Sequence, residues 1–323
     1  MDALSDMLRV VGLTGGIFLD ARFTAPWCIA GQVSPDLCAP FMAPPSRLVC
    51  FHFIVEGNCF IEVSGKDPVA AGEGDAVLLS RNELHKIGSD LRLQPTPAGD
   101  IMLSPEGAGV SRIVHGGDGE RCTMVCGFLG GDAQLEPLLK TLPSLLKLKV
   151  RDTPGGEWIA QSFRYGAQQL VNGDPGAATI MSKMSELLFV EAVRRHLTTM
   201  PQAQTGFLAG LRDPAVGKAL ALMHTQVARN WTAEDIADAV NLSRSAFAER
   251  FTTLMGQPPM RYLTGWRMQA AGHRLREGRQ TIAQIAFEVG YESEAAFARA
   301  FKREVGMPPA AWRKEQLKMP EPA

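Results

Sequence analysis

Long hydrophobic runs are missing from this chain of 323 residues. No segment reaches the roughly 20 consecutive apolar residues that a membrane-spanning helix needs, which argues against a membrane protein. The N-terminus carries Asp2 and Asp6 where a secretory signal peptide would carry lysine or arginine, so we expect no export signal. The sequence therefore predicts a cytoplasmic protein with no membrane partner.

Cysteine is scarce and unevenly placed. The six cysteines all lie between Cys28 and Cys126, which is too few for a disulfide scaffold in a chain of this length, so we expect reduced thiols. Cys122 and Cys126 share one face of a strand, but they lie about 13 Å apart, too far for a disulfide between them. Buried structural thiols are the main interpretation, and a redox sensor with one reactive thiolate is the alternative.

A large net charge is also absent. The 33 basic and 34 acidic residues nearly cancel, so the whole chain does not indicate a charged partner. The two parts differ, however, because residues 207–323 contain 16 basic and 12 acidic residues, whereas residues 1–206 contain 17 and 22. An acidic part and a basic part suggest two tasks, with any polyanion bound by the second.

Residues from about 20 to 130 show short strands separated by turns. Five apolar stretches rich in β-forming residues are bounded by glycine, asparagine, aspartate or proline: 48–57, 59–63, 76–80, 111–117 and 121–131. This pattern predicts a sandwich or a small barrel. A barrel can enclose a small ligand without any metal.

Residues 74–85 resemble the second sequence motif of cupins, with Ser80 and Asn82 in place of the usual proline and glycine. The first cupin motif normally supplies two histidines and a glutamate to a metal. Here Cys50 occupies the glutamate position, and the stretch before it contains no histidine. Only His85 remains of that ligand set, which argues against a metal-dependent cupin enzyme.

Cys50 and His52 lie two residues apart on an expected strand, so their side chains share a face. Together with His85 they form a candidate effector pocket. We interpret the three residues as pocket wall, and the alternative is a soft metal site with nitrogen and sulfur ligands. The sequence therefore predicts neither a metal nor a cofactor.

The segment 131–206 changes to a helical period. Apolar residues recur along 157–171 and 177–197, and the apolar face of the second stretch is wide enough to require burial. Packing onto the chain's own barrel and pairing with a second copy explain this pattern equally well. The segment is therefore predicted to be a helical linker or dimerisation element.

The last third of the chain contains an internal repeat. Residues 243–259 align with 293–309 without a gap, and eight of the seventeen pairs are identical. Upstream, 236–242 matches 285–291 with one extra residue in the second turn. A short helix, a turn and a second helix are thus predicted twice.

The ends of these helices are marked by the same residues in both copies. Ser243 and Ser293 are expected N-caps, and Gly256 and Gly306 are expected to end the helices before a pair of prolines. Two helices joined by a short turn in a basic region are typical of DNA-binding helix-turn-helix units. Between them, 259–278 predicts one helix about 28 Å long. A spacer of this length suits two recognition helices that enter major grooves about 34 Å apart on one duplex.

The region 207–315 resembles the C-terminal domain of the AraC/XylS family of bacterial transcription regulators. The first unit, the sequence PMRYLTGWRMQAA, the segment GYESEAAFARAFKREVG and the closing PPAAWRK carry this resemblance. The first half resembles the cupin-type sensor of some members. The chain is therefore expected to be an α+β protein of two domains. The expected parts are 1–130, a cupin-like barrel; 131–206, a helical linker; 207–316, an all-α domain with two helix-turn-helix units; and 317–323, a flexible tail.

The phenylalanines of each second helix are expected to face inward. The residues on the opposite, outward face are the ones predicted to contact DNA. In the first copy these are Arg244, Ser245, Ala248, Glu249 and Thr252. In the second copy they are Glu294, Ala295, Ala298, Arg299 and Lys302. Arg299 is predicted to bind guanine, whereas Arg244 and Lys302 are expected to hold phosphates. Glu249 either accepts a hydrogen bond from cytosine or pairs with a neighbouring arginine.

These features predict a sequence-specific transcription regulator rather than an enzyme. The expected partners are double-stranded DNA, a small-molecule effector, a second copy of the chain and, for an activator, RNA polymerase. A thiol-switched regulator is the alternative, and a metal-dependent cupin enzyme is a weaker one. The sequence identifies neither the effector nor the operator.

Overall fold

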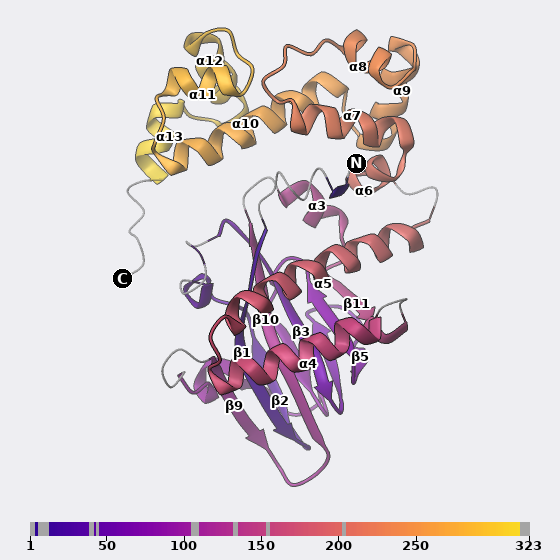
Figure 1. The fold of residues 1–323 in the computed structure, drawn as a ribbon, viewed down its shortest axis with the longest axis vertical. Coiled ribbons are helices and arrows are strands. Elements are labelled where there is room, and N and C mark those ends of the chain that lie inside the picture. Colours follow the sequence, from indigo (N-terminus) through magenta and orange to yellow (C-terminus); the bar gives the residue numbers. More distant parts are fainter. Residues whose placement is uncertain are drawn as a thin grey trace. The chain divides into compact units, whose positions relative to one another are not determined.

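The computed structural model describes residues 4–5, 13–38, 42, 45–104, 110–131, 135–152, 156–201 and 205–316. The expected tail, 317–323, lies outside the described residues. The chain is α+β and divides into two compact units, which confirms the expected two-domain architecture (Figure 1). The first unit comprises Leu13–Gly131 and Leu142–Thr198, and the second comprises Met1–Gly12, Asp132–Thr141 and Thr199–Ala323.

A six-stranded sheet forms the larger layer of the first unit, in the order β11-β6-β3-β10-β1-β9. Its strands are β1 (Thr14–Thr24), β3 (Arg47–Glu56), β6 (Asp75–Leu79), β9 (Ser111–Gly116), β10 (Arg121–Gly131) and β11 (Leu145–Lys149). All neighbours are antiparallel except β1 and β9, which run parallel. Strand β11 falls in the segment expected to be helical. Its leucines at 146 and 148 alternate with lysines, which is the period of a strand.

A five-stranded sheet forms the second layer, in the order β5-β4-β7-β2-β8. Its strands are β2 (Cys28–Gly31), β4 (Asn58–Val63), β5 (Val69–Gly72), β7 (His85–Gly88) and β8 (Thr96–Pro97). Apolar side chains from both sheets meet in one buried cluster that includes Leu19, Ile54, Ile61, Ile87 and Met124. The core of the first unit therefore lies between the two sheets.

The expected closed barrel is not formed, because the strands make two separate sheets. Closure would require a continuous ladder of hydrogen bonds around every junction. Strand β8 has only two residues, and the short helix α2 (Ala98–Ile101) follows it directly. Next to β9, the backbone of Leu103 forms only an isolated bridge with Arg112. The strand pattern at this side is too short to close the ring.

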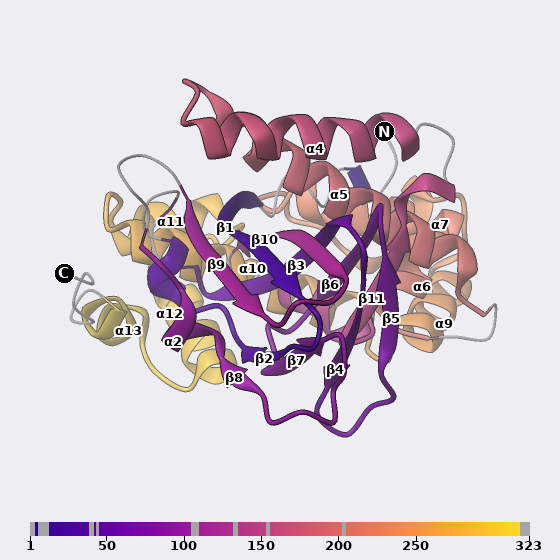
Figure 2. The ribbon, with the colours of Figure 1, turned by 90° about the horizontal axis from the view of Figure 1, so that it is seen from below.

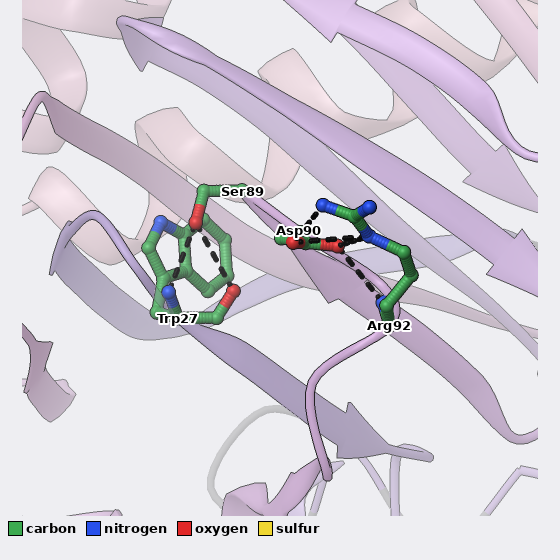
Figure 3. A network of polar contacts seen from close by, with 4 residues as sticks. All are labelled: Trp27, Ser89, Asp90 and Arg92. Carbon is green, nitrogen blue, oxygen red and sulfur yellow. Dashed lines mark hydrogen bonds and ion pairs between the residues drawn. The ribbon is translucent and has the colours of Figure 1, made fainter.

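The chain after β7 is fastened to the start of β2 by a small polar network (Figure 3). The amide of Trp27 donates to Oγ of Ser89 at 2.9 Å, and Oγ of Ser89 lies 3.3 Å from the carbonyl oxygen of Trp27. Immediately after it, the Arg92 guanidinium forks onto the Asp90 carboxylate, which lowers the pKa of that carboxyl to about 2. The Trp27–Ser89 contacts fasten the β2–β7 pair that forms one wall of the cavity described below, whereas the Asp90–Arg92 pair is local to the loop after β7.

Two long helices, α4 (Gly156–Asn172) and α5 (Ala177–Thr199), cover the outer face of the six-stranded sheet (Figures 1 and 2). The ring of Phe163 on α4 stacks on Phe53 of β3, with centroids 4.7 Å apart. A Cβ at Gly15 of β1 would lie 2.7 Å from the Cβ of Ser185, so glycine permits the close approach of α5. These contacts place α4 and α5 in the same compact unit as the sheets.

The second unit is helical. Its helices are α3 (Glu136–Thr141), α6 (Phe207–Arg212), α7 (Pro214–Thr225), α8 (Ala233–Ala239), α9 (Arg244–Met255), α10 (Pro259–Glu277), α11 (Ile282–Glu288), α12 (Glu294–Val305) and α13 (Pro309–Gln316). The pairs α8–α9 and α11–α12 are the two expected helix-turn-helix units, and α10 connects them (Figure 1). Among the described residues, no helix combines the length and apolar composition needed to cross a membrane.

The turns of the two units have the same left-handed backbone at equivalent positions. Asn241 has φ 59° in the first turn, and Gly290 has φ 83° in the second. Asparagine and glycine are the residues that adopt this conformation most readily. The expected glycine stops at Gly256 and Gly306 are also left-handed C-caps. The duplication therefore extends from the side chains to the backbone.

His224 on α7 is a buried polar side chain beneath the first helix-turn-helix unit. Its Nε2 lies 2.7 Å from the hydroxyl oxygen of Tyr262, and its ring stacks on Trp266 with centroids 3.7 Å apart. Burial disfavours the charged imidazolium and lowers the pKa of His224 from 6.5 to about 3.

Acid is therefore expected to destabilise the second unit through His224. In the unfolded chain the pKa returns to about 6.5, so between that pH and about 3 the unfolded state binds the extra proton. Stability is fully present above about pH 6.5 and falls as the pH is lowered, by about 2 kcal/mol at pH 5. Urea unfolding at pH 7 and 5 should show a smaller pH effect in His224→Asn than in the wild type. Equal pH effects in both proteins would contradict this assignment.

Candidate nucleic-acid interface and ligand pocket

The second helix of each repeat, α9 or α12, buries one face and presents the other to solvent. Both helices begin at the expected caps: Oγ of Ser243 accepts from the amide of Ala246 at 3.3 Å, and Oγ of Ser293 from that of Ala296 at 3.2 Å. The inward faces consist of four fully buried phenylalanines, Phe247, Phe251, Phe297 and Phe301. Because the helices have the same start and the same buried face, their outward positions correspond one to one.

The ten residues predicted to contact DNA all lie on α9 and α12, away from these phenylalanines. Eight of them are exposed: Arg244, Ser245, Glu249, Thr252, Glu294, Ala295, Arg299 and Lys302. The other two, Ala248 and Ala298, are half-buried at equivalent positions. Small residues at 248 and 298 let another surface approach both helix backbones closely.

Several charges on these outward faces are not neutralised by the chain itself. Arg244, Glu249, Arg299 and Lys302 have no ion-pair partner among the described residues. Arg250, in contrast, is paired with Asp213 at 2.6 Å. These unpaired basic side chains, Arg244 at the start of α9 and Arg299 and Lys302 further along α12, are available to an anionic partner such as a phosphate backbone.

Two arginines of the connecting helix α10, Arg267 and Arg274, have structural roles instead. The Arg267 guanidinium donates to the carbonyl oxygens of Val227 at 3.1 Å and Arg229 at 2.7 Å. Arg274 pairs with Glu288 of α11 at 2.9 Å. These contacts fix α10 against the segment before the first helix-turn-helix unit and against the first helix of the second unit.

A cavity of about 430 Å³ lies between the two sheets of the first unit. Its walls come mainly from β1, β2, β3, β7 and β10 and from α2, and they are mostly apolar. The side chains on these walls include Leu19, Ala21, Phe23, Ile29, Val33, Ile87, Met102 and Met124. A cavity of this size and character suits a small, largely apolar molecule.

Four polar side chains gather at one end of this cavity. Nε2 of His52 lies 2.8 Å from Nε2 of His85 and 3.7 Å from Sγ of Cys50. Nδ1 of His52 lies 2.9 Å from Sγ of Cys126, its register partner on β10. Nδ1 of His85 lies 3.0 Å from the carbonyl oxygen of Glu83. The structure thus brings together the three predicted pocket residues and adds Cys126.

Burial controls the protonation of this cluster. It lowers the pKa of His52 well below 6.5, with a further decrease from the neighbouring His85, and it also lowers the pKa of His85. The pKa values of Cys50 and Cys126 are raised by the same desolvation. At neutral pH the cluster therefore contains neutral imidazoles and neutral thiols.

The two cysteines considered for redox chemistry do not contact each other in the way a sensor pair would. Cys122 forms a hydrogen bond with Cys59, which lowers the pKa of Cys122, whereas Cys126 contacts His52. All six cysteines are free and buried. Burial raises the pKa of Cys126, which is opposite to the reactive thiolate that a sensor requires.

Comparison with known proteins covers both units. A cupin family model matches residues 2–198, and a helix-turn-helix domain model matches residues 236–315. A putative AraC-like transcription regulator of Streptomyces lividans is 35% identical over 97% of this chain and 98% of its own length. The chain belongs to the family of AraC-like transcription regulators. A second such regulator, from Streptomyces antibioticus, is 32% identical over 98% of this chain and 100% of its own length.

The AraC-like regulator also matches solved structures along its length. The match with ToxT from Vibrio cholerae O395 covers 95% of this chain and 99% of ToxT, at 12% identity and a TM-score of 0.36. The full-length relatives are transcription regulators, so the chain is a DNA-binding regulator of transcription and not an enzyme. Neither the thiol-switch alternative nor the cupin-enzyme alternative is favoured by these relatives.

Sequence reasoning on this AraC-like regulator missed two parts of the pocket. Strands β1 and β2, which supply much of the apolar wall, were not predicted as strands. Cys126 was interpreted as a buried structural thiol, or alternatively as a redox residue, and not as part of the pocket, although it faces the same cavity as His52. The alternation along 121–131 indicates which of its residues share a face, but it does not indicate which strand lies opposite.

Proposed function

We propose that this regulator senses a small, largely apolar molecule in the cavity of its cupin unit and thereby changes how its two helix-turn-helix units bind DNA. The cavity of about 430 Å³, with its apolar wall and one polar end at His52 and His85, is the observation that carries the proposal. Such a ligand acts by binding one arrangement of the protein better than another, which shifts the population between them.

On the DNA side, we propose that α9 and α12 enter successive major grooves. Helix α10 has 19 residues and so spans about 28 Å, which is close to the rise of one duplex turn. Arg299 is proposed to form hydrogen bonds with guanine. Glu249 occupies the equivalent position in the first copy, where it is proposed to accept a hydrogen bond from cytosine. Lys302 and Arg244 are proposed to hold phosphates, and the remaining outward residues lie near base edges.

The sensing proposal is tested with a cavity-filling substitution. Ala21 lines the cavity at a buried position of β1, so Ala21→Trp fills the space, and Ala70→Trp makes the same change at an exposed strand position. A compound library is screened by thermal shift on the full-length protein, where a ligand at 100 times its dissociation constant adds about 2.7 kcal/mol. We expect Ala21→Trp to lose this stabilisation and Ala70→Trp to keep it. Equal stabilisation of both variants would place the ligand elsewhere.

We also propose that a second copy of the chain pairs through α4 and α5. Large apolar side chains remain exposed on both helices at seven-residue spacing: Trp158 and Tyr165 on α4, and Ile180 and Leu187 on α5. Residues seven apart lie on one helix face, so each helix presents an apolar stripe away from the sheet. Aromatic side chains of this kind dominate the energetics of protein interfaces.

Trp158→Glu is expected to weaken this pairing. Burying a carboxylate in the interface and losing the indole should cost more than about 2 kcal/mol, which is about a thirtyfold increase in the dimer dissociation constant. Sedimentation velocity over a concentration series measures this change. Phe60→Glu, which alters an exposed aromatic residue of β4, is the control and should leave the association unchanged. An unchanged dimer in Trp158→Glu would remove this face from the interface.

A further inference from the structure

We infer that Cys50, His52 and His85 bind one zinc ion at the polar end of the cavity. One atom from each residue, Sγ of Cys50 and a ring nitrogen of each histidine, lies within 4.8 Å of the other two, and all three side chains are buried. This set replaces the two histidines and the glutamate of the usual first cupin motif. It retains only the histidine of the second motif.

The separations between the donor atoms are close to those of a zinc site. Zinc lies about 2.0–2.1 Å from nitrogen and about 2.3 Å from sulfur, so tetrahedral ligands are about 3.3–3.7 Å apart. The distance from Sγ of Cys50 to Nε2 of His52 is 3.7 Å, and that between the two Nε2 atoms is 2.8 Å. The third separation, between Sγ of Cys50 and a ring nitrogen of His85, is within 4.8 Å, so movements of up to about 1 Å admit the ion.

Each histidine also has a partner for its second ring nitrogen. Nδ1 of His85 faces the carbonyl oxygen of Glu83 at 3.0 Å, which fixes the proton there and leaves Nε2 as the donor of a lone pair. Nδ1 of His52 faces Sγ of Cys126 at 2.9 Å. Metal-binding histidines nearly always donate the other N–H to an oxygen or similar acceptor, and both histidines have this arrangement.

The chemistry of the donors narrows the choice of metal. One thiolate and two imidazoles suit zinc or copper, whereas magnesium and calcium prefer oxygen ligands, and we assign zinc because three protein ligands with one open position are typical of it. On binding, the Cys50 thiol loses its proton to solvent and its sulfur bonds to the ion, while Nε2 of each histidine donates a lone pair. The ring proton of His52 then stays on Nδ1, which donates a hydrogen bond to Sγ of Cys126.

Three protein ligands leave one position of a tetrahedral zinc ion open, and all three residues line the cavity. The ion therefore gives the pocket a recognition point for a carboxylate or thiolate carried by an apolar molecule. This role rests on the proposed sensing function, whereas the occurrence of the ion does not.

Metal content of the full-length protein tests the inference. Protein stripped with a chelator and reloaded with zinc should retain about one ion per chain after desalting. Cobalt loaded in its place should give a thiolate-to-cobalt charge-transfer band in the near ultraviolet. Cys50→Ser should lose the cobalt band, and His85→Gln, which keeps an N–H for the Glu83 carbonyl, should lose the zinc. Cys28→Ser, which alters another buried free cysteine, should keep both.

A positioning role for Cys126 is measured with the same proteins. Cys126→Val should weaken zinc binding by about 10–100-fold and leave the cobalt thiolate band in place at saturation, because Cys50 remains the sulfur ligand. Wild-type protein that retains no zinc, that takes up copper without zinc, or that keeps the cobalt band in Cys50→Ser would overturn the inference. DNA binding assayed on the same samples separates the two proposals, since a zinc-free protein that binds DNA normally contradicts only the metal site.

Discussion

Alanine in place of Phe301 is expected to lower the free energy of unfolding of the helical unit by about 3–5 kcal/mol. The side chain is fully buried between α12 and its neighbours, and its ring meets Phe297 at 5.5 Å and Trp312 at 5.9 Å between centroids. Removing it leaves a cavity beneath the outward face that carries Arg299. The recognition helix therefore loses its support together with its stability.

A matched control for this substitution lies on the preceding helix. Phe287 of α11 is 58% exposed, so Phe287→Ala removes the same atoms from a solvated position. Chemical denaturation monitored by circular dichroism should show a large loss for Phe301→Ala and a change within about 0.5 kcal/mol for Phe287→Ala. Similar losses in the two variants would mean that the repeat is not held together by its phenylalanine face.

Arg299→Ala is expected to weaken binding to the cognate operator by about 1–3 kcal/mol, or about 5–150-fold, and to relax sequence preference at one base pair. The substitution removes a bidentate contact to guanine. It breaks no ion pair within the described part of the chain, because Arg299 has no ion-pair partner there. Fluorescence anisotropy with the operator and with single-base variants measures both effects.

Lys302 is the comparison within the same helix. Lys302→Ala should weaken binding to all sequences alike and reduce the slope of log affinity against log salt by about one, because a phosphate contact carries no sequence information. If Arg299→Ala and Lys302→Ala changed affinity and preference identically, the assignment of base reading to one and phosphate binding to the other would be wrong.

The helical unit could be predicted in detail because its signals are local. Ser293, Gly306 and the spacing of Phe297 and Phe301 define the start, end and buried face of α12 within fourteen residues. The repetition of this pattern with Ser243 at the start of α9 provided an independent check from within the same chain. Caps and glycine stops depend on neighbouring backbone groups, so distant contacts do not override them.

The sheet unit was predicted less completely because its contacts are distant in sequence. Strand β1 pairs with β10, which lies about a hundred residues later in the chain, and its stretch TGGIFLDARFT does not alternate clearly. The cluster at the polar end of the cavity has the same origin. Residue parity showed that Cys50 and His52 share a face, but the meeting of His52 with His85 required β3 and β7 to lie in opposite sheets.

The expected barrel failed for a related reason. The residue pattern predicts where strands and turns occur along the chain. Closure of the barrel depends instead on the length of the strands at each junction between the sheets. At the junction next to β9, strand β8 is only two residues long, and no local residue pattern indicates this. Similarly, β11 follows the second unit's α3 in the chain but pairs with β6 of the first unit, a connection that no local signal predicts.

Protection of guanine N7 from methylation on an operator fragment tests the account most directly, because this atom faces the major groove. With the full-length protein at low salt, we expect two protected patches per protomer, about 10 base pairs apart on one face of the duplex. Arg299→Ala should lose protection in one patch only. A single patch, or protection that is the same on unrelated DNA, would contradict the claim that α9 and α12 read neighbouring grooves.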